Sequence, residues 1–135
     1  MKKHLLMLAL ASTCFMATQA GAMTKDEYKA GKEKIEADYK AAKAQCDALK
    51  DNAKDVCQKE AKGKENVAKA ELEQQYKPSD SHARKVAEEK VKANYEVAKE
   101  KCDDQAGDAK AACVKQAKAD ESQGKADIKA MKKSM

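Results

Sequence analysis

Apolar side chains follow a heptad spacing in the segment that begins near residue 28. They occur at steps of 7, 4, 3, 4 and 3 residues, at Tyr28, Ile35, Tyr39, Ala42, Cys46 and Leu49. This a/d spacing places side chains along one seam of a helix that packs against a second helix. Thr24 and Glu27 form a capping box, which starts helices. The pattern therefore predicts a long helix, and Lys32 is its one polar interruption.

The helical pattern occurs twice in the chain. A shift of 56 positions aligns residues 29–72 with residues 85–128. The shift also aligns the cysteines, Cys46 with Cys102 and Cys57 with Cys113. Ala, Lys, Glu and Gln favour helix in both copies, and no strand pattern with a period of two appears. The chain is therefore an internal duplication of a helical unit.

Each copy contains a predicted turn. Asp51 and Gly107 are equivalent, and glycine is the residue that most often adopts the left-handed conformation at a helix end. Asn52 and Asp108 follow, and both residue types are good N-caps. The turns are predicted between residues 51 and 52 and between 107 and 108.

These turns indicate how the cysteines pair. Four cysteines allow three connectivities, but each pair of Cys46 with Cys57 and Cys102 with Cys113 lies symmetrically about its own turn. A disulfide needs Cα atoms about 4.4–6.8 Å apart, which closely packed antiparallel helices provide. We expect disulfides Cys46–Cys57 and Cys102–Cys113. Four thiolates could instead bind zinc or copper, but ten residues separate each pair, against about two to four in zinc sites.

A break between the copies surrounds Pro78, because proline restricts the residue before it and the following serines and aspartate can cap a helix. The predicted domains are a signal peptide (1–22), hairpin repeat 1 (23–76), a linker (77–82) and hairpin repeat 2 (83–135). The predicted fold class is all-α, with two tandem disulfide-stapled antiparallel helical hairpins. The sequence leaves open whether the hairpins pack together; a thin four-helix bundle is favoured over tethered hairpins.

The N-terminus has the pattern of a cleaved secretory signal. Lys2 and Lys3 precede an apolar run, and Ala20-Gly21-Ala22 offers a small-residue cleavage site. Lipidation of Cys14 is the alternative, but Ala11 and Thr13 stand where a lipoprotein signal has leucine and a small residue. Export places the four remaining cysteines in an oxidising compartment, where disulfides persist.

The mature chain has few groups suited to catalysis. Its single histidine, His82, falls in the predicted linker without a partner, and no nucleophile, phosphate-loop or metalloprotease motif occurs. We expect no enzyme activity, no catalytic residue and no cofactor. Tyr28, Tyr39 and Tyr95 are assigned to helix seams, whereas Tyr76 is ambiguous.

Acidic and basic residues alternate along the mature chain. The formal net charge of +5 falls to +3 when Lys2 and Lys3 leave with the leader. Mixed charge of this kind is typical of solvated helix faces, so nucleic acid is not an expected partner.

The segments around the cysteines resemble a known group of proteins. Three runs are similar to those of Ala/Lys-rich exported proteobacterial helical proteins with Cys-x10-Cys repeats: Tyr39 to Cys46-Asp47, Asn52 to Cys57, and Tyr95 to Cys102-Asp103. That group is often labelled TolA-like or cell-envelope biogenesis. The resemblance covers nearly the whole mature chain. It implies a periplasmic location and no enzymatic activity.

The resulting hypothesis is a non-enzymatic periplasmic helical protein that serves as a structural, stress-related or protein-interaction module of the cell envelope. Its expected partner is another envelope protein, and no membrane span is expected after signal cleavage. The competing hypothesis is a ligand binder, for metal ions through cysteines or for anionic envelope polymers through lysines. The sequence leaves the oligomeric state open.

Overall fold

The computed structural model describes residues 22–133, which form four long helices and no strand. The helices are α1 (Lys25–Cys46), α2 (Asp51–Tyr76), α3 (Asp80–Lys101) and α4 (Gly107–Lys133), with a short 3-10 turn, η1 (Cys102–Asp104), between α3 and α4. The predicted all-α class is confirmed. Residues 1–21 of the predicted leader, Cys14 among them, lie outside the described residues.

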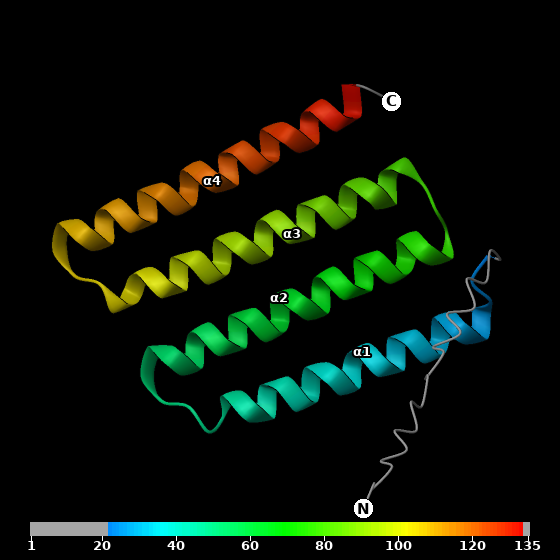
Figure 1. Ribbon diagram of the computed structural model, residues 1–135, viewed down its shortest axis with the longest axis horizontal. Coiled ribbons are helices and arrows are strands. Elements are labelled where there is room, and N and C mark those ends of the chain that lie inside the picture. Colours follow the sequence, from blue (N-terminus) through cyan, green and yellow to red (C-terminus); the bar gives the residue numbers. More distant parts are fainter. Residues whose placement is uncertain (1–21, 134–135) are drawn as a thin grey trace, which may run out of the picture.

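Two stapled hairpins follow each other along the chain. Cys46 is bonded to Cys57 with Cα atoms 5.5 Å apart, and Cys102 to Cys113 with Cα atoms 5.6 Å apart. Both predicted connectivities are therefore confirmed. α1 runs antiparallel to α2, and α3 antiparallel to α4 (Figure 1).

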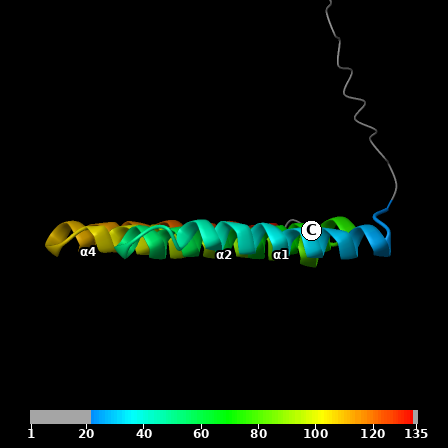
Figure 2. The same ribbon diagram turned by 90° about the horizontal axis from the view of Figure 1, so that it is seen from below.

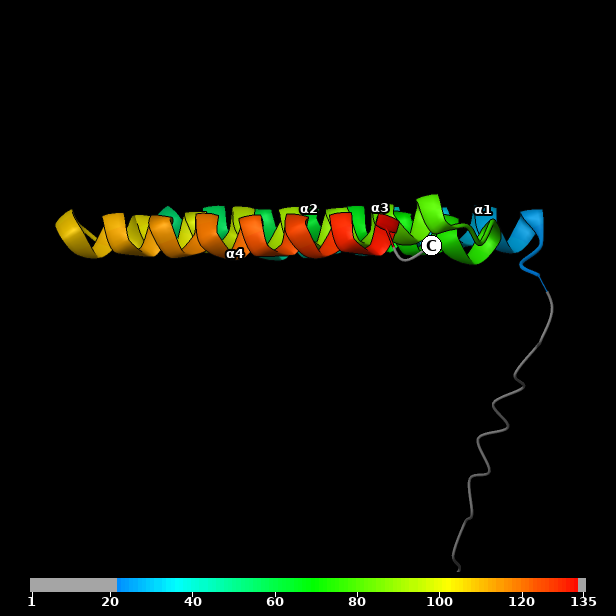
Figure 3. The same cartoon turned by 90° about the horizontal axis from the view of Figure 1, so that it is seen from above.

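The four helices lie side by side in a single flat layer. Figure 1 shows the order α1, α2, α3, α4 across the layer, and the edge-on views of Figures 2 and 3 show that it is one helix thick. Extensive packing joins only neighbours: α1 with α2, α2 with α3 and α3 with α4. The hairpins do pack together, but not as the favoured four-helix bundle, since α1 and α4 occupy opposite edges.

The layer follows from where the small contact residues stand on the inner helices. On α2, Gly63 faces Ala93 of α3, whereas Leu72 faces Gly31 of α1. Residues 63 and 72 are nine positions apart, which at about 3.6 residues per turn places them on opposite sides of the helix. A bundle needs its two contact stripes on adjacent sides of each helix, so α2 is built for a layer.

The turns differ in detail from the predicted ones. Asp51 and Gly107 do have positive φ, 50° and 56°, but they begin the second helix of each hairpin and do not end the first. α1 stops at Cys46, so Leu49 lies in the connection and is 42% exposed. Its predicted place on the helix seam is wrong, because the helix ends before reaching it.

The connection between the hairpins is shorter than the predicted linker. α2 ends at Tyr76 and α3 begins at Asp80. The hydroxyl of Ser79 accepts a hydrogen bond from the backbone N–H of His82 and caps α3. His82 therefore lies in the first turn of a helix, and Ser79 is the capping residue among the serines and aspartate of this segment.

The buried set is small, as expected for one layer. Its apolar members are alanines, one leucine and two cysteines: Cys46, Ala61, Ala70, Leu72, Cys102 and Ala117. No helix within residues 22–133 is both long enough and apolar enough to cross a membrane.

Candidate functional site

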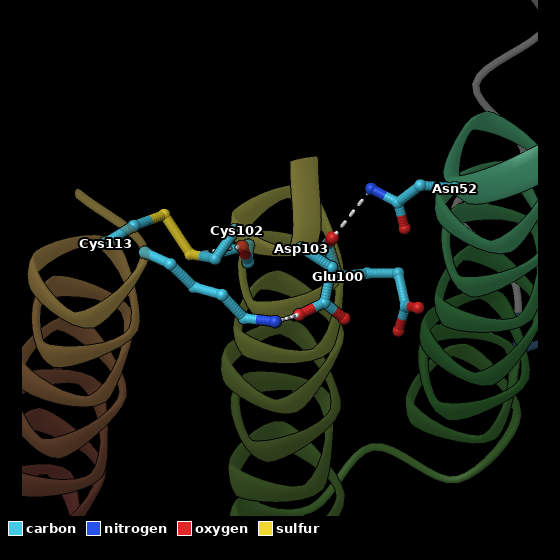
Figure 4. The surroundings of a disulfide bond; sticks show 7 residues. Asn52, Glu100, Cys102, Asp103 and Cys113 are labelled. Carbon is cyan, nitrogen blue, oxygen red and sulfur yellow. Dashed lines mark hydrogen bonds and ion pairs between the residues drawn. A yellow bond between two sulfur atoms is a disulfide. The ribbon is translucent and has the colours of Figure 1, made fainter. Parts of the chain in front are cut away.

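The turn of each hairpin carries the same group of side chains. In repeat 2, the Cys102–Cys113 disulfide lies beside an ion pair of Lys110 Nζ with Asp103 Oδ1 at 2.8 Å (Figure 4). Repeat 1 has the equivalent pair, Lys54 with Asp47 at 3.2 Å. Both ion pairs are largely exposed, so each adds little to stability. The disulfide is the dominant link in each group.

The two turns are also connected to each other. The side-chain amide of Asn52 donates a hydrogen bond of 3.0 Å to the backbone carbonyl of Glu100, at the end of α3 (Figure 4). Asn52 was predicted to cap α2, but α2 begins one residue earlier and Asn52 instead bridges the hairpins. Asp108, its counterpart, lies in the first turn of α4.

The disulfides are built as structural links. One cysteine of each disulfide, Cys46 or Cys102, is completely buried, and its partner, Cys57 or Cys113, is partly buried, which limits the access that an external thiol needs for exchange. All four sulfurs are bonded in pairs, so a thiolate metal site would need prior reduction. Residues 22–133 contain no group of three or more His, Cys, Asp and Glu side chains that could hold a metal ion.

Within residues 22–133, one charged side chain is buried. Glu65 on α2 is 6% exposed and pairs with Lys62 at 2.7 Å and with Lys69 at 2.6 Å. Burial raises the pKa of the Glu65 carboxyl, but the hydrogen bonds and charges of the two lysines outweigh it, and the net pKa is lowered. Glu65 is thus an ionised, fully paired carboxylate. It is suited to holding its lysines in place and not to accepting a proton near neutral pH.

A tyrosine cluster closes the open end of the first hairpin. The rings of Tyr28 on α1 and Tyr76 on α2 stack with centroids 4.4 Å apart and planes 17° apart. The Tyr28 hydroxyl donates a hydrogen bond to Glu73, and this bond to a carboxylate raises the pKa of Tyr28. Lys32 and Lys77 lie over the two rings. The cluster is a clasp at the end opposite the disulfide.

The remaining sequence-predicted residues are spread over the layer. Tyr39 is half-buried beneath Lys62, whose Nζ is 5.1 Å from the ring centroid. Tyr95 lines the grooves between α3 and α4. His82 Nδ1 lies 2.6 Å from the carbonyl oxygen of Lys77, a distance at which the ring nitrogen donates. The structure does not bring these side chains together.

An open groove of about 850 Å³ runs between α2 and α3. Its floor is apolar and consists mainly of Gly63, Val67, Ala93 and Val97. Two interhelical ion pairs border it, Lys90 with Glu71 at 2.7 Å and Lys101 with Glu60 at 3.1 Å. A groove with an apolar floor and paired charges can bind by shape, but it offers no group that is arranged for a reaction.

Comparisons with known proteins identify no relative. No family model matches the chain, and neither the curated proteins nor the solved structures include a significant match.

Three further features of the site have a signal in the sequence. Glu65 is flanked by lysines three positions before and four after, which is the spacing of helical ion pairs. The ion pair at each turn is conserved by the duplication, since residues 47 and 54 recur as 103 and 110. Each interhelical seam contains one glycine, Gly31, Gly63 or Gly124. A glycine inside a helix signals close approach of a neighbouring element.

Proposed function

We propose that the protein is a non-enzymatic exported helical protein of the periplasm, where it serves as a protein-interaction module of the cell envelope. The observation that carries this proposal is the shape of the layer. A layer that is one helix thick presents two broad faces (Figure 2). The groove between α2 and α3 is open to solvent. Broad faces with shallow grooves suit the docking of another protein, since docking needs area rather than an enclosed pocket.

The disulfides support the choice of compartment. Intrachain disulfides such as Cys46–Cys57 and Cys102–Cys113 form and persist in oxidising compartments such as the bacterial periplasm. The N-terminal signal pattern of the sequence points the same way. The staples would also suit a module that has to hold its shape outside the cytoplasm, in a structural or stress-related role.

The ligand-binding alternative has less support. Metal binding through cysteines competes with the disulfides for the same sulfur atoms. Anionic envelope polymers could bind the lysines of α4, where Lys110, Lys115 and Lys118 line a shallow depression. Lys110 is already paired with Asp103. At physiological salt, the attraction between exposed charges that are more than about 8 Å apart is largely screened.

The experiment uses the full chain expressed with its own leader. We expect a periplasmic product that starts near residue 23 and has no free thiol. A photo-crosslinking residue is then placed at Lys64 in the α2/α3 groove, with Lys92, which is also exposed but lies outside that groove, as the matched position. One discrete protein adduct from Lys64, retained at 0.15 M salt and absent from Lys92, is the expected result.

Several outcomes would refute the proposal. Retention in the cytoplasm with reduced cysteines contradicts the location. If Lys64 and Lys92 give identical adducts, or if neither gives an adduct, the α2/α3 groove is not a docking site for a protein. A saturable, salt-resistant complex with purified lipopolysaccharide or peptidoglycan would favour the ligand-binding alternative instead.

A further inference from the structure

The two long edges of the layer are equivalent to the seam at its centre. α1 and α3 run in the same direction, as do α2 and α4, so a sideways shift relates one hairpin to the other (Figure 1). Within the chain, α3 packs on α2. The α1 of a second copy, laid beside α4, would repeat this seam and extend the layer. A head-to-tail contact of this kind does not close and generates filaments.

We propose that these edges are a suppressed self-assembly interface, in which side chains at three positions prevent a second copy of this chain from docking. The three positions are Lys40 on α1 and Asp108 and Ala119 on α4. Each differs from its counterpart in the α2/α3 seam in a way that removes or reverses a contact of that seam.

At the first position, Ala119, a second copy would be excluded by steric overlap. Gly63 of α2 lies so close to α3 that a Cβ atom at this glycine would be 2.8 Å from the Cβ of Ala93. The edge counterparts of these residues are Ala119 and Ala37. Two methyl groups would therefore meet where the inner seam has room for only one, and the helices could not approach to the spacing of the inner seam.

At the second position, Lys40, a second copy would be excluded by repulsion between like charges. The inner seam has an ion pair between Lys59 and Glu96, at 3.8 Å. At the edges these residues correspond to Lys115 and Lys40, so a lysine would face a lysine. Opposed like charges are a common means of excluding an unwanted partner.

The other two ion pairs of the inner seam give no compensating gain. Lys101 with Glu60 becomes a glutamine opposite a glutamine, Gln45 and Gln116. Lys90 with Glu71 keeps its charges, since Lys34 and Asp127 stand in its place. One attractive pair thus remains at the edges, against three in the inner seam.

The third position concerns the hydrogen bond between the hairpins. In the inner seam, the side-chain amide of Asn52 donates a hydrogen bond to the backbone carbonyl of Glu100. Asp108 replaces it at the edge, opposite the carbonyl of Ala44. An ionised carboxylate has no proton to donate, so two acceptors would face each other.

If the two edges do not bind a second copy, the two broad faces of the layer remain available to any partner. The suppressed interface rests on the duplication and on the α2/α3 contacts, and it holds whether or not the protein docks in the periplasm. The experiments that test the two proposals are therefore independent.

The test restores the inner-seam residues at the edges. Sedimentation velocity at about 0.15 M salt compares the oxidised mature protein with the triple variant K40E/D108N/A119G over a wide concentration range. We expect the unmodified protein to remain monomeric, and the triple variant to gain mass with concentration through dimers to longer chains. Head-to-tail assembly of the unmodified protein, or a triple variant that stays monomeric at millimolar concentration, overturns the proposal.

Two further variants keep the test decisive. Glycine weakens a helix, so K40E/D108N keeps Ala119; it should assemble more weakly than the triple variant but more than the unmodified protein. If the triple variant does not fold, this double variant decides. The matched control D55N/K64E makes the same charge changes at exposed positions of α2, an inner helix that borders neither edge. Equal assembly of this control would show that net charge, and not the edges, governs association.

Discussion

Asp51 and Gly107 occupy the same place in the two hairpins, with φ of 50° and 56°. A left-handed conformation costs an ordinary L-residue roughly 1–2 kcal/mol, and aspartate somewhat less. We expect Asp51→Gly to stabilise the protein by about 0.5–1 kcal/mol, because part of the gain is offset by losing a carboxylate from the first turn of α2. Urea midpoints measure the change.

The reciprocal substitution is the control. No atom lies within 4 Å of a Cβ added at Gly107, so Gly107→Asp meets no steric obstacle and reverses both the backbone effect and the carboxylate effect. It should lower the free energy of unfolding by roughly the amount that the first variant gains. Unchanged midpoints for both variants would show that the positive φ carries no cost.

Glu65 predicts a dependence of stability on pH. Its pKa in the folded protein lies below the ordinary 4.5, so its contribution is present above that value and is lost as the pH falls through the lowered pKa. Glu65→Gln should therefore destabilise the protein at pH 7 and have little effect near about pH 2. Melting curves at the two pH values provide the measurement. An equal loss at both would assign the effect to packing instead of charge.

The residue scale also shows what the sequence can and cannot predict. The capping box at Thr24 and Glu27 was predicted and is present, because both of its bonds are local. The bridge from Asn52 to Glu100 was not predicted, since it joins residues 48 positions apart. Local patterns identify which groups need a partner, whereas the partner itself depends on how the hairpins pack.

At the scale of the helices, glycine sets how closely neighbours approach. Gly63→Ala would place a methyl 2.8 Å from the Cβ of Ala93, which can yield only if the helices move apart. Gly31→Ala meets the flexible end of Leu72, also at 2.8 Å. We expect a loss of about 1–3 kcal/mol for the first variant. The second should be near neutral, because alanine's helix propensity of about 1 kcal/mol offsets the shift of Leu72.

A double variant separates crowding from other effects. Ala93→Gly removes the methyl that opposes the new one, so it should restore part of the stability lost in Gly63→Ala despite its own cost in helix propensity. Strictly additive losses in the double variant would contradict close contact at this point of the α2/α3 seam. Thermal unfolding of the four proteins completes the cycle.

The hairpins should respond unequally to loss of their disulfides. Each closes a separation of 11 residues, and the chain-entropy estimate gives roughly 3 kcal/mol for either. The tyrosine clasp of hairpin 1 has no counterpart in hairpin 2, where Arg84 and Lys132 stand at the positions of Tyr28 and Tyr76. Replacing Cys102 and Cys113 by alanine should therefore loosen α4 more than the equivalent change loosens α1.

Hydrogen exchange measures this difference helix by helix. We expect the amides of α4 to exchange faster in the Cys102→Ala/Cys113→Ala variant than the amides of α1 in the Cys46→Ala/Cys57→Ala variant. Tyr28→Ala added to the second variant should remove the asymmetry. Equal exchange of α1 and α4 without that addition would mean that the clasp contributes nothing.

The heptad pattern predicted the hairpins but not their arrangement in space. Spacing along α1 identifies one apolar side, which is all that an edge helix needs. The inner helices use two opposite sides, and their contacts are made by Gly63, Ala93 and Leu72, two of which are too small to register as hydrophobic signals. The spacing of large apolar residues therefore predicts the hairpins but not their arrangement in a single layer.

The shape of the whole molecule gives the most direct test of the layer. Helices of 22–27 residues, with a rise of about 1.5 Å per residue and spacings of about 9 Å, form a slab roughly 37 Å wide, 38 Å long and 10 Å thick. Such a slab has a radius of gyration of about 16 Å, whereas the same helices in a bundle give about 13 Å.

Small-angle X-ray scattering distinguishes the single layer from the bundle. We expect the larger radius of gyration, of about 16 Å, together with a distance distribution that falls slowly at long range, because α1 and α4 are separated by the two inner helices. Reducing agent should shift the curve further from the compact form, since opening a staple frees an edge helix. A compact profile for the oxidised protein would mean that α1 and α4 meet, and the edges could then no longer be the place where a second copy is excluded.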